Sequence, residues 1–228
     1  MRLARPLVLH PRFVGSALLA CLGAFVLSTS ARAGFEPVSN SQCIGAHRLG
    51  PDSSVATGSR ALGPSRGLAQ TFRTDDTLVR AVTVWLPGPS RVLRAPLRVY
   101  LTLADHAGRP RLDQIIAEGP PVSRGAGDGI RPSRFEFTFS PPLALPARGT
   151  YAVVVIADEC GLVSLLTRDE LRAARQPLWE VARRGCAGSI SEARGELSDH
   201  QLVMQVEVCD RGTMVSGRTW GEMKARYR

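Results

Sequence analysis

The fold is decided by residues 67–90, which read GLAQTFRTDDTLVRAVTVWLPGPS. Apolar side chains occupy alternate positions around Phe72, and they do so again at Val82, Val84 and Leu86. A Thr-Asp-Asp turn separates the two runs, and no catalytic motif lies between them. Because successive side chains of an extended chain point to opposite faces, this pattern predicts two antiparallel strands with one buried face each.

The same alternation recurs along most of the chain. In RFEFTFS, Phe135, Phe137 and Phe139 share one face, whereas Glu136 and Thr138 share the other. The predicted strands are Ala69–Phe72, Leu78–Leu86, Leu97–Leu103, Ile115–Glu118, Arg134–Phe139, Thr150–Ala157, Leu178–Ala182 and Gln201–Val208. Many short strands separated by Gly- and Pro-rich turns predict an all-β protein, an antiparallel β-sandwich of jelly-roll type.

One segment departs from the strand pattern. LLTRDELRAARQP places Thr167 three residues before Glu170, which is a capping-box spacing, and Pro177 ends the run of good helix formers. This spacing predicts a short helical insertion from Arg168 to about Gln176.

The N-terminal residues read as a targeting segment. Arg2, Arg5 and Arg12 precede an apolar run, and Ala31-Arg32-Ala33 forms a small-residue cleavage site. The run is short for a membrane span, which needs about 20 residues. A lipoprotein cysteine at Cys21 is the alternative, although the chain stays apolar after it. We expect a chain that is exported to the periplasm or the extracellular space, with no transmembrane segment in its mature form.

Four regions follow from these patterns. They are a signal peptide at 1–33, an extended leading segment at 34–66, the sandwich domain at 67–210 and a loosely ordered basic tail at 211–228. The net charge of +9 falls to +5 without the signal peptide, which holds four arginines and no acid. The remaining arginines are scattered among acids with few aromatic neighbours, so the sequence predicts no nucleic-acid partner.

Four cysteines remain after the signal peptide, an even number that suggests disulfides in an exported chain. We favour Cys43–Cys209, which would tie the leading segment to the last strand, and this leaves Cys160–Cys186. A zinc site is the alternative, but the chain has no C-x-x-C motif.

The order of motifs resembles a β-sandwich module, jelly-roll or galactose-binding-like, that is widespread in exported bacterial proteins. The resemblance covers about residues 68–208. Its motifs are Gln70-Thr71-Phe72, Asp105 with Gly108 and Pro110, Phe137–Phe139, Pro142–Leu145 and Gly149-Thr150-Tyr151. It implies the sandwich fold, and it favours carbohydrate as the ligand class. The Cys160–Cys186 region departs from the module, which has a glycine- and tryptophan-containing hairpin there.

Trp85 is the candidate ligand-binding residue. It follows Val84 on a strand, so it points away from the face that Val82, Val84 and Leu86 share. If those three line the core, Trp85 faces outward and offers a platform on which a sugar ring could stack. The alternative places Trp85 beneath the helix or a loop.

Two acidic pairs are candidates for a structural calcium ion, and the sequence predicts no other cofactor. The pairs are Asp75 with Asp76 and Asp158 with Glu159. Each lies at the end of a strand, where carboxylate and carbonyl oxygens occur together, as Ca²⁺ requires. Adjacent carboxylates in a turn do not indicate the cleft that a glycosidase needs.

Catalytic motifs are weak. Residues 63–67, GPSRG, match G-x-S-x-G, but no strand-to-helix turn surrounds Ser65, so a simple turn is the better interpretation. The histidines after the signal peptide, His47, His106 and His200, read as surface residues, and Asp199 beside His200 has no adjacent nucleophile.

The sequence therefore predicts a non-enzymatic exported module that binds an extracellular or envelope component, with carbohydrate favoured by resemblance. A structural or protein-interaction module without a small ligand is the second hypothesis, and a hydrolase of unrecognised type is the third. A flat sheet with a long unpaired edge strand would favour the second hypothesis. The patterns leave the oligomeric state open.

Overall fold

The computed structural model describes residues 43–88, 96–122, 130–158, 162–169, 177–186, 189–197 and 199–211. These residues form thirteen strands and one short 3-10 turn, η1. The elements are β1 (Cys43–Leu49), η1 (Ser53–Val55), β2 (Gly58–Leu62), β3 (Arg66–Thr74), β4 (Leu78–Leu86), β5 (Leu97–Ala104), β6 (Pro110–Glu118), β7 (Ser133–Ala144), β8 (Gly149–Ala157), β9 (Val163–Asp169), β10 (Leu178–Arg183), β11 (Ile190–Leu197), β12 (His200–Leu202) and β13 (Met204–Arg211).

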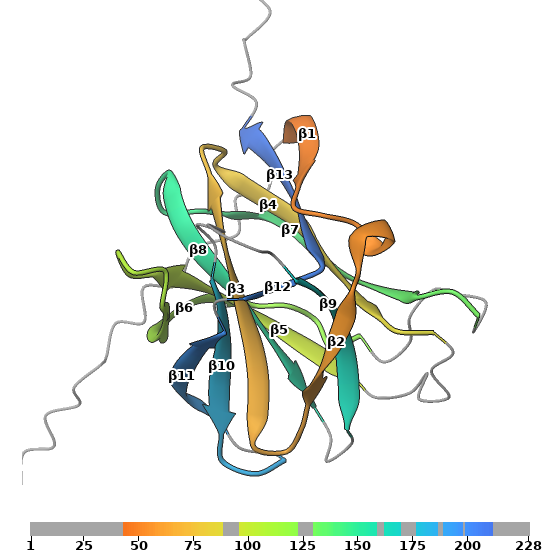
Figure 1. Ribbon diagram of the computed structural model, residues 1–228. Helices are drawn as coiled ribbons and strands as arrows, with labels where there is room; N and C mark the ends of the chain where they lie inside the picture. Colours follow the sequence, from red (N-terminus) through yellow and green to blue (C-terminus); the bar gives the residue numbers. More distant parts are fainter. Residues whose placement is uncertain are drawn as a thin grey trace, which may run out of the picture. The chain divides into compact units, whose positions relative to one another are not determined.

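The strands make three sheets, and every pairing within them is antiparallel (Figure 1). A four-stranded sheet has the order β1-β13-β4-β7. A six-stranded sheet has the order β11-β10-β3-β8-β5-β6, and a small sheet has the order β12-β9-β2. The all-β sandwich predicted from the alternating pattern is therefore confirmed.

The main core lies between the four-stranded and six-stranded sheets. Alternate residues of each strand point into it, as the period of two requires. From the four-stranded sheet come Val82, Val84, Leu86, Phe135, Phe137, Val206 and Val208, and from the six-stranded sheet come Leu68, Phe72, Leu97, Val99, Leu101, Tyr151, Val153 and Val155. All of these side chains are buried, so this core carries most of the apolar burial that stabilises the fold.

All eight predicted strands are present in the structure. The last one is divided, because β12 and β13 belong to different sheets on either side of Val203. The sandwich also begins earlier than residue 67: β1 pairs with β13 and β2 pairs with β9. The sequence 34–66 lacks a regular apolar period because both strands lie at sheet edges, where most of their side chains are exposed or half-buried.

The predicted helix is wrong at its first residues. Arg168 and Asp169 continue β9 and pair with Gln201 and His200 of β12. The cross-strand hydrogen bonds of this pairing outweigh the local helix preference of the capping-box spacing. Residues 170–176 lie outside the described residues, as do the predicted signal peptide at 1–33 and residues 212–228 of the predicted tail.

The predicted Cys43–Cys209 disulfide is confirmed, with 5.4 Å between the two Cα atoms. It joins β1 to β13 within the four-stranded sheet. Cys186 is also disulfide-bonded, and its partner lies outside the described residues, so the pairing with Cys160 stays a prediction. Among the described residues, no helix has the length and apolar character needed to cross a bilayer.

Both faces of the six-stranded sheet are covered, unlike those of a sandwich sheet with one solvated side. Its inner face forms the main core. Its outer face, the side turned away from the four-stranded sheet, carries a second buried apolar cluster of Ala69, Val154, Ile156, Trp179, Val181 and Ala193. The two edge strands β6 and β11 approach each other across this face, so the sheet curls toward a half-barrel (Figure 1).

Candidate functional site

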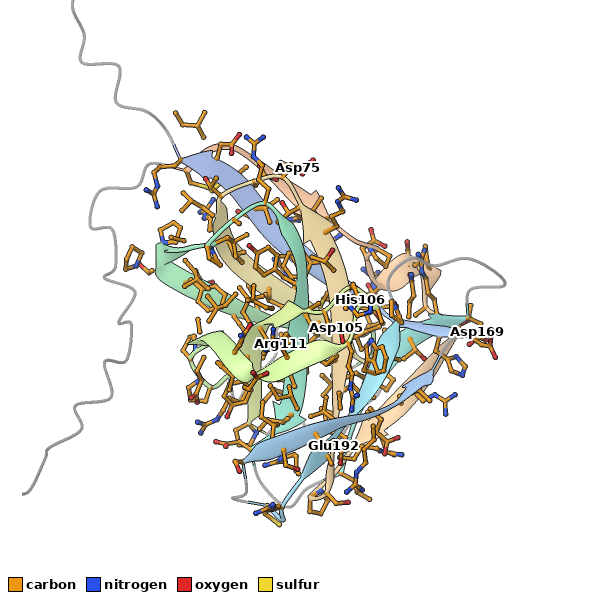
Figure 2. The ribbon with its side chains drawn as sticks, turned by 90° about the vertical axis from the view of Figure 1, so that its left-hand side faces the viewer. Asp75, Asp105, His106, Arg111, Asp169 and Glu192 are labelled. Atoms are coloured by element: carbon orange, nitrogen blue, oxygen red, sulfur yellow. A yellow bond between two sulfur atoms is a disulfide. The ribbon has the colours of Figure 1, made fainter. Side chains whose placement is uncertain are left out.

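The candidate site is the β6–β11 groove, an open groove of about 440 Å³ between the two edge strands of the curled sheet. It is lined by Asp105, Arg109, Pro110, Arg111, Leu112, Asp113, Ser191, Glu192 and Ala193. Figure 2 shows Asp105 and Arg111 on the β5–β6 side of this region and Glu192 on β11. Curling of the sheet thus brings together side chains about 80 residues apart in the sequence.

A tight turn before β6 forms one end of the groove. The Asp105 carboxylate accepts hydrogen bonds from the backbone N–H groups of Ala107 and Arg109, both at 2.9 Å. Gly108 completes the turn with φ of 79°, a conformation that glycine adopts without steric cost. The turn fixes the backbone from which the Arg109 side chain extends.

A bulge in β6 carries the groove residues away from the sheet. Thr102 of β5 pairs with Ile115, and Ala104 pairs with Pro110, so residues 111–114 lie opposite Leu103 alone. The extra residues have no ladder partner on β5. They fold over the outer face, where Leu112 packs against the apolar cluster. We call residues 110–114 the β6 bulge.

Arg109 connects the β6 side of the groove to β11. Its Nη2 donates a 2.7 Å hydrogen bond to the carbonyl oxygen of Ala193 and lies 4.0 Å from Glu192 Oε1. Glu192 also lies 3.6 Å from Arg194 Nε. The guanidinium group therefore holds the two edge strands at a fixed separation and leaves one side of Glu192 facing the groove.

The charges that line the groove compensate one another. Arg111 Nη2 donates to Asp113 Oδ2 at 3.0 Å, and this hydrogen bond lowers the pKa of Asp113. Glu192 forms ion pairs with Arg109 and Arg194. A groove of carboxylates and guanidinium groups without a dominant sign presents many hydrogen-bond acceptors and donors, and it does not attract either sign of ionic ligand.

A second polar cluster lies at the other end of the outer face. Arg98 of β5 bridges Glu118 and Asp158, and the hydrogen bond to Asp158 raises the pKa of Arg98. Burial raises the pKa of the neighbouring Tyr100. Arg183 donates to the carbonyl oxygens of Ala157 and Cys186, and burial lowers its pKa. These bonds anchor the end of the sheet.

Trp85 is buried, with 7% of its surface exposed, so the expectation of an outward platform is wrong. It does point away from the main core, as the alternation predicted. The small sheet covers it, however, and Trp85 packs with Leu166 of β9, Val203 and Ala56. A sequence period gives the direction of a side chain, but it does not show which distant strand covers that face.

The candidate calcium residues do not form one site. Asp75 and Asp76 follow Thr74, which pairs with Gly149 at the start of β8, whereas Asp158 lies just beyond the other end of β8. Asp76 accepts a hydrogen bond from Thr74, and Asp158 pairs with Arg98. Glu159 lies outside the described residues. Within the described ranges, no group of three or more potential metal-ligating side chains is found, and calcium stays a prediction.

The histidines are distributed over three places. His200 Nδ1 lies 2.8 Å from Asp169 Oδ1, and its Nε2 contacts the Arg60 guanidinium, so a neutral His200 accepts there. His47 Nε2 lies 3.5 Å from Asp76 Oδ2. His106 is exposed in the turn before β6. The carboxylate partner of His200 is thus Asp169, which the sequence analysis did not identify.

Ser65 lies in the turn that joins β2 to β3. Gly63 and Arg66 exchange backbone hydrogen bonds of 2.9 and 3.2 Å around Pro64 and Ser65. A strand follows this turn, where a nucleophile elbow needs a helix. The interpretation of GPSRG as a simple turn is confirmed.

Sequence reasoning did not find the β6–β11 groove. The turn residues Asp105, Gly108 and Pro110 were recognised, but Arg109, Arg111, Asp113 and Glu192 were not. The sequence RPRLD, residues 109–113, was a usable signal for a polar site. Two arginines and an aspartate lie close together there, and the packing of a half-buried edge strand does not require these charges. The pairing with β11 has no local signature.

No protein-family model and no curated protein matches this chain. Two solved structures are similar in part. One contains the cysteine protease and lectin-like domains of Cwp84, a surface-layer-associated protein of Clostridium difficile, with 11% identity over 67% of this chain and 36% of that chain, at a TM-score of 0.45. The other is a variant of clostridial Cwp84 after propeptide cleavage, with 10% identity over 72% and 40% of the two chains, at a TM-score of 0.47. This chain thus spans well under half of either chain, and at this similarity we draw no inference from them.

Proposed function

We propose that this protein is a non-enzymatic exported module that binds a neutral carbohydrate in the β6–β11 groove. The observation that carries the proposal is the lining of the groove, in which Asp113 and Glu192 face an open space while arginines compensate their charges. Paired carboxylates and guanidinium groups offer several acceptors and donors in fixed positions, as a polyhydroxylated ligand requires.

Two features support export. The Cys43–Cys209 disulfide is of a kind that persists in oxidising compartments such as the periplasm or the extracellular space. The N-terminal pattern of arginines, apolar residues and an Ala-x-Ala site is typical of a signal peptide. Together they favour a protein that meets its ligand outside the cytoplasm.

The geometry of the histidines favours binding over catalysis. A Ser-His-Asp site needs a hydroxyl at the second nitrogen of a histidine that a carboxylate orients. At His200 the carboxylate is present, but the second nitrogen contacts Arg60. The Arg60 guanidinium therefore occupies the position that the hydroxyl of a nucleophile would need.

Three edge strands, β1, β2 and β7, disfavour the alternative of a protein-interaction module that recruits a strand. The Ala61 carbonyl oxygen on β2 accepts from Arg66 Nε at 3.0 Å, and the Gly45 carbonyl oxygen on β1 accepts from His47 Nδ1 at 3.1 Å. β7 carries adjacent prolines at 141 and 142, which cannot donate. Groups of this kind block the addition of a further strand.

The experiment is a glycan array probed with the oxidised, exported protein. We expect retention of a neutral glycan, and roughly tenfold weaker binding after Asp113→Asn or Glu192→Gln, because each change removes a charge-assisted hydrogen bond. The matched control is Glu136→Gln, which alters an exposed Arg–Glu pair on the four-stranded sheet and should leave binding unchanged.

Two results would reject the proposal. One is an array on which no glycan is retained. The other is retention that the groove variants and Glu136→Gln leave equally unaffected. Retention of a protein partner through β1, β2 or β7 would instead favour the interaction module.

A further inference from the structure

Unpaired polar atoms gather on the outer face of the six-stranded sheet. Among the described residues, six buried side-chain nitrogen or oxygen atoms have no hydrogen-bond partner. Five belong to this face, namely Thr71 Oγ1, Arg98 Nε, Thr102 Oγ1, Trp179 Nε1 and Arg183 Nε, and the sixth is Ser133 Oγ of β7. Since most buried polar atoms in native proteins are paired, their concentration on one face calls for a reason.

Two of the five are explained by the sheet end that they anchor. Arg98 and Arg183 use their other nitrogens to bond Asp158 and the carbonyl oxygen of Ala157. The remaining three atoms, on Thr71, Thr102 and Trp179, have no such compensation, although all three residues are at least nine-tenths buried.

The strand register brings these three residues to one area. Thr71 and Thr102 both lie opposite Ala152 on β8, one on each side of it. Trp179 lies opposite Ala69, two residues before Thr71 on β3. With neighbouring strands about 4.8 Å apart, the two hydroxyl groups stand roughly 10 Å apart across the small side chain of Ala152. This is a buried position flanked by two hydroxyl groups, and the indole of Trp179 lies two strands away from Ala152 on the same face.

The turn before β6 and the β6 bulge cover this face of the sheet. Gly108 of the turn lies over Thr71, since a Cβ atom at Gly108 would stand 3.7 Å from Thr71 Cγ2. Leu112 packs onto the apolar cluster that includes Ala69, Val154 and Trp179. Among the described polar contacts, Arg109 is the side chain that joins the bulge side to β11, through its bond to the Ala193 carbonyl oxygen. The cover therefore consists of the turn at Gly108 and the β6 bulge. Residues 111–114 of the bulge have no strand partner on β5, and residues 111–113 also line the proposed ligand groove.

We infer that Thr71, Thr102 and Trp179 form an inner subsite, into which one neutral pyranose ring of the bound glycan inserts when the β6 bulge and the turn before it move aside. The inference rests on the proposed carbohydrate function. The apolar face of the ring lies against Trp179 and Ala152, and its hydroxyl groups bond the two threonines, each of which both donates and accepts. The indole N–H supplies a donor to a ring or hydroxyl oxygen.

The test uses Thr71→Val and Thr102→Val, which keep the shape of the side chain and remove the hydroxyl group. For a glycan that the wild-type protein retains on the array, we expect roughly tenfold weaker binding in each variant by calorimetric titration. Both variants should also have a higher melting temperature than the wild type, because an unpaired buried hydroxyl destabilises the free protein. Loss of affinity together with a gain in stability is the signature of a ligand-binding position.

Ser133→Ala is the matched control. It removes the sixth unpaired polar atom, which lies in the four-stranded sheet, and it should raise the melting temperature without changing affinity. If a valine variant fails to fold, Trp179→Phe removes the indole donor, keeps an aromatic ring and should weaken binding in the same way.

The outcomes separate the inner subsite from the groove. If the wild type binds a glycan and both valine variants bind it equally well, the inner subsite is wrong and the groove proposal stands. If the wild type retains no glycan on the array, both fail together.

Discussion

The two faces of the six-stranded sheet are both buried, yet they differ in chemistry. The inner face presents Leu97, Val99 and Leu101 of β5 to the main core, and its buried polar side chains Gln70 and Tyr151 are hydrogen-bonded. The outer face of the same strand presents Arg98, Tyr100 and Thr102, with buried polar atoms that lack partners. Burial alone therefore does not define a core. Among the described residues, the inner face of this sheet has no buried polar side-chain atom without a hydrogen-bond partner, whereas the outer face has several.

Under our proposal of an inner subsite, this difference separates stability from function along a single strand. A side chain on the inner face gains free energy by leaving water, whereas an unpaired hydroxyl on the outer face costs free energy in the absence of a ligand. A position that costs stability in the free protein is expected where a ligand supplies the missing partner. The four predictions that follow test this division.

The largest effect should come from the disulfide, which lies outside both faces and sets the scale for them. Cys43 and Cys209 are 166 residues apart, and closure of so long a loop in the unfolded chain is worth about 5 kcal/mol in the loop-entropy model. The double variant Cys43→Ala, Cys209→Ala should lower the free energy of unfolding toward this extent, measured by urea denaturation, because it removes this bridge and keeps the one at Cys186. If removal of this disulfide costs the Thr102→Val protein the same free energy of unfolding as the wild type, the disulfide acts independently of the outer face. Unchanged stability in both backgrounds would contradict the assigned role.

Leu101→Ala tests the inner face. Leu101 is 1% exposed in the main core, so the variant should lose about 3 kcal/mol through lost burial and the remaining cavity. Chemical denaturation followed by circular dichroism measures the loss. A change below about 1 kcal/mol would place Leu101 outside the tightly packed core and would remove the contrast between the faces.

Thr102→Val tests the neighbouring residue on the outer face. Thr102 is fully buried and its hydroxyl has no partner among the described residues, so the free protein should gain about 1 kcal/mol. The substitutions Leu101→Ala and Thr102→Val, at adjacent residues of β5, would then change the free energy of unfolding in opposite directions. A loss of stability in Thr102→Val would show that the hydroxyl is satisfied in the free protein.

The smallest effect should appear in alkali. Burial raises the pKa of both Tyr151 on the inner face and Tyr100 on the outer face above the usual value near 10. The unfolded chain therefore loses these protons first. The stability contribution of the two neutral phenols is complete below pH 10 and falls as the pH rises through the folded-state values. Phenolate absorbance during a pH titration, compared between Tyr151→Phe and Tyr100→Phe, assigns each group, and two tyrosines that ionise at the ordinary pH would contradict the burial of both faces.

The strands and the sandwich class could be predicted because they depend on local periodicity. Leu78–Leu86 is β4 with the same bounds, since a turn of Thr-Asp-Asp before it and Pro87 after it limit the run. Disulfide pairing was also accessible, because an early and a late cysteine flank all the predicted strands.

The curl of the six-stranded sheet could not be predicted. It depends on the β6 bulge and on the approach of β6 to β11, two strands far apart in sequence. Trp85 shows the same limit, because its direction followed from the pleat but its covering by β9 did not. Long-range coverage decides which outward-facing residues meet solvent, and the period of one strand contains no information about another.

The bond between Cys43 and Cys209 has a mechanical consequence. A tensile force applied to the chain on either side of the domain reaches these two sulfur atoms before it reaches the strands between them. The load then passes through a covalent link instead of the hydrogen-bonded ladders. An oxidised module of this kind should extend very little in a single-molecule pulling measurement, and it would hold its shape while tethered under flow.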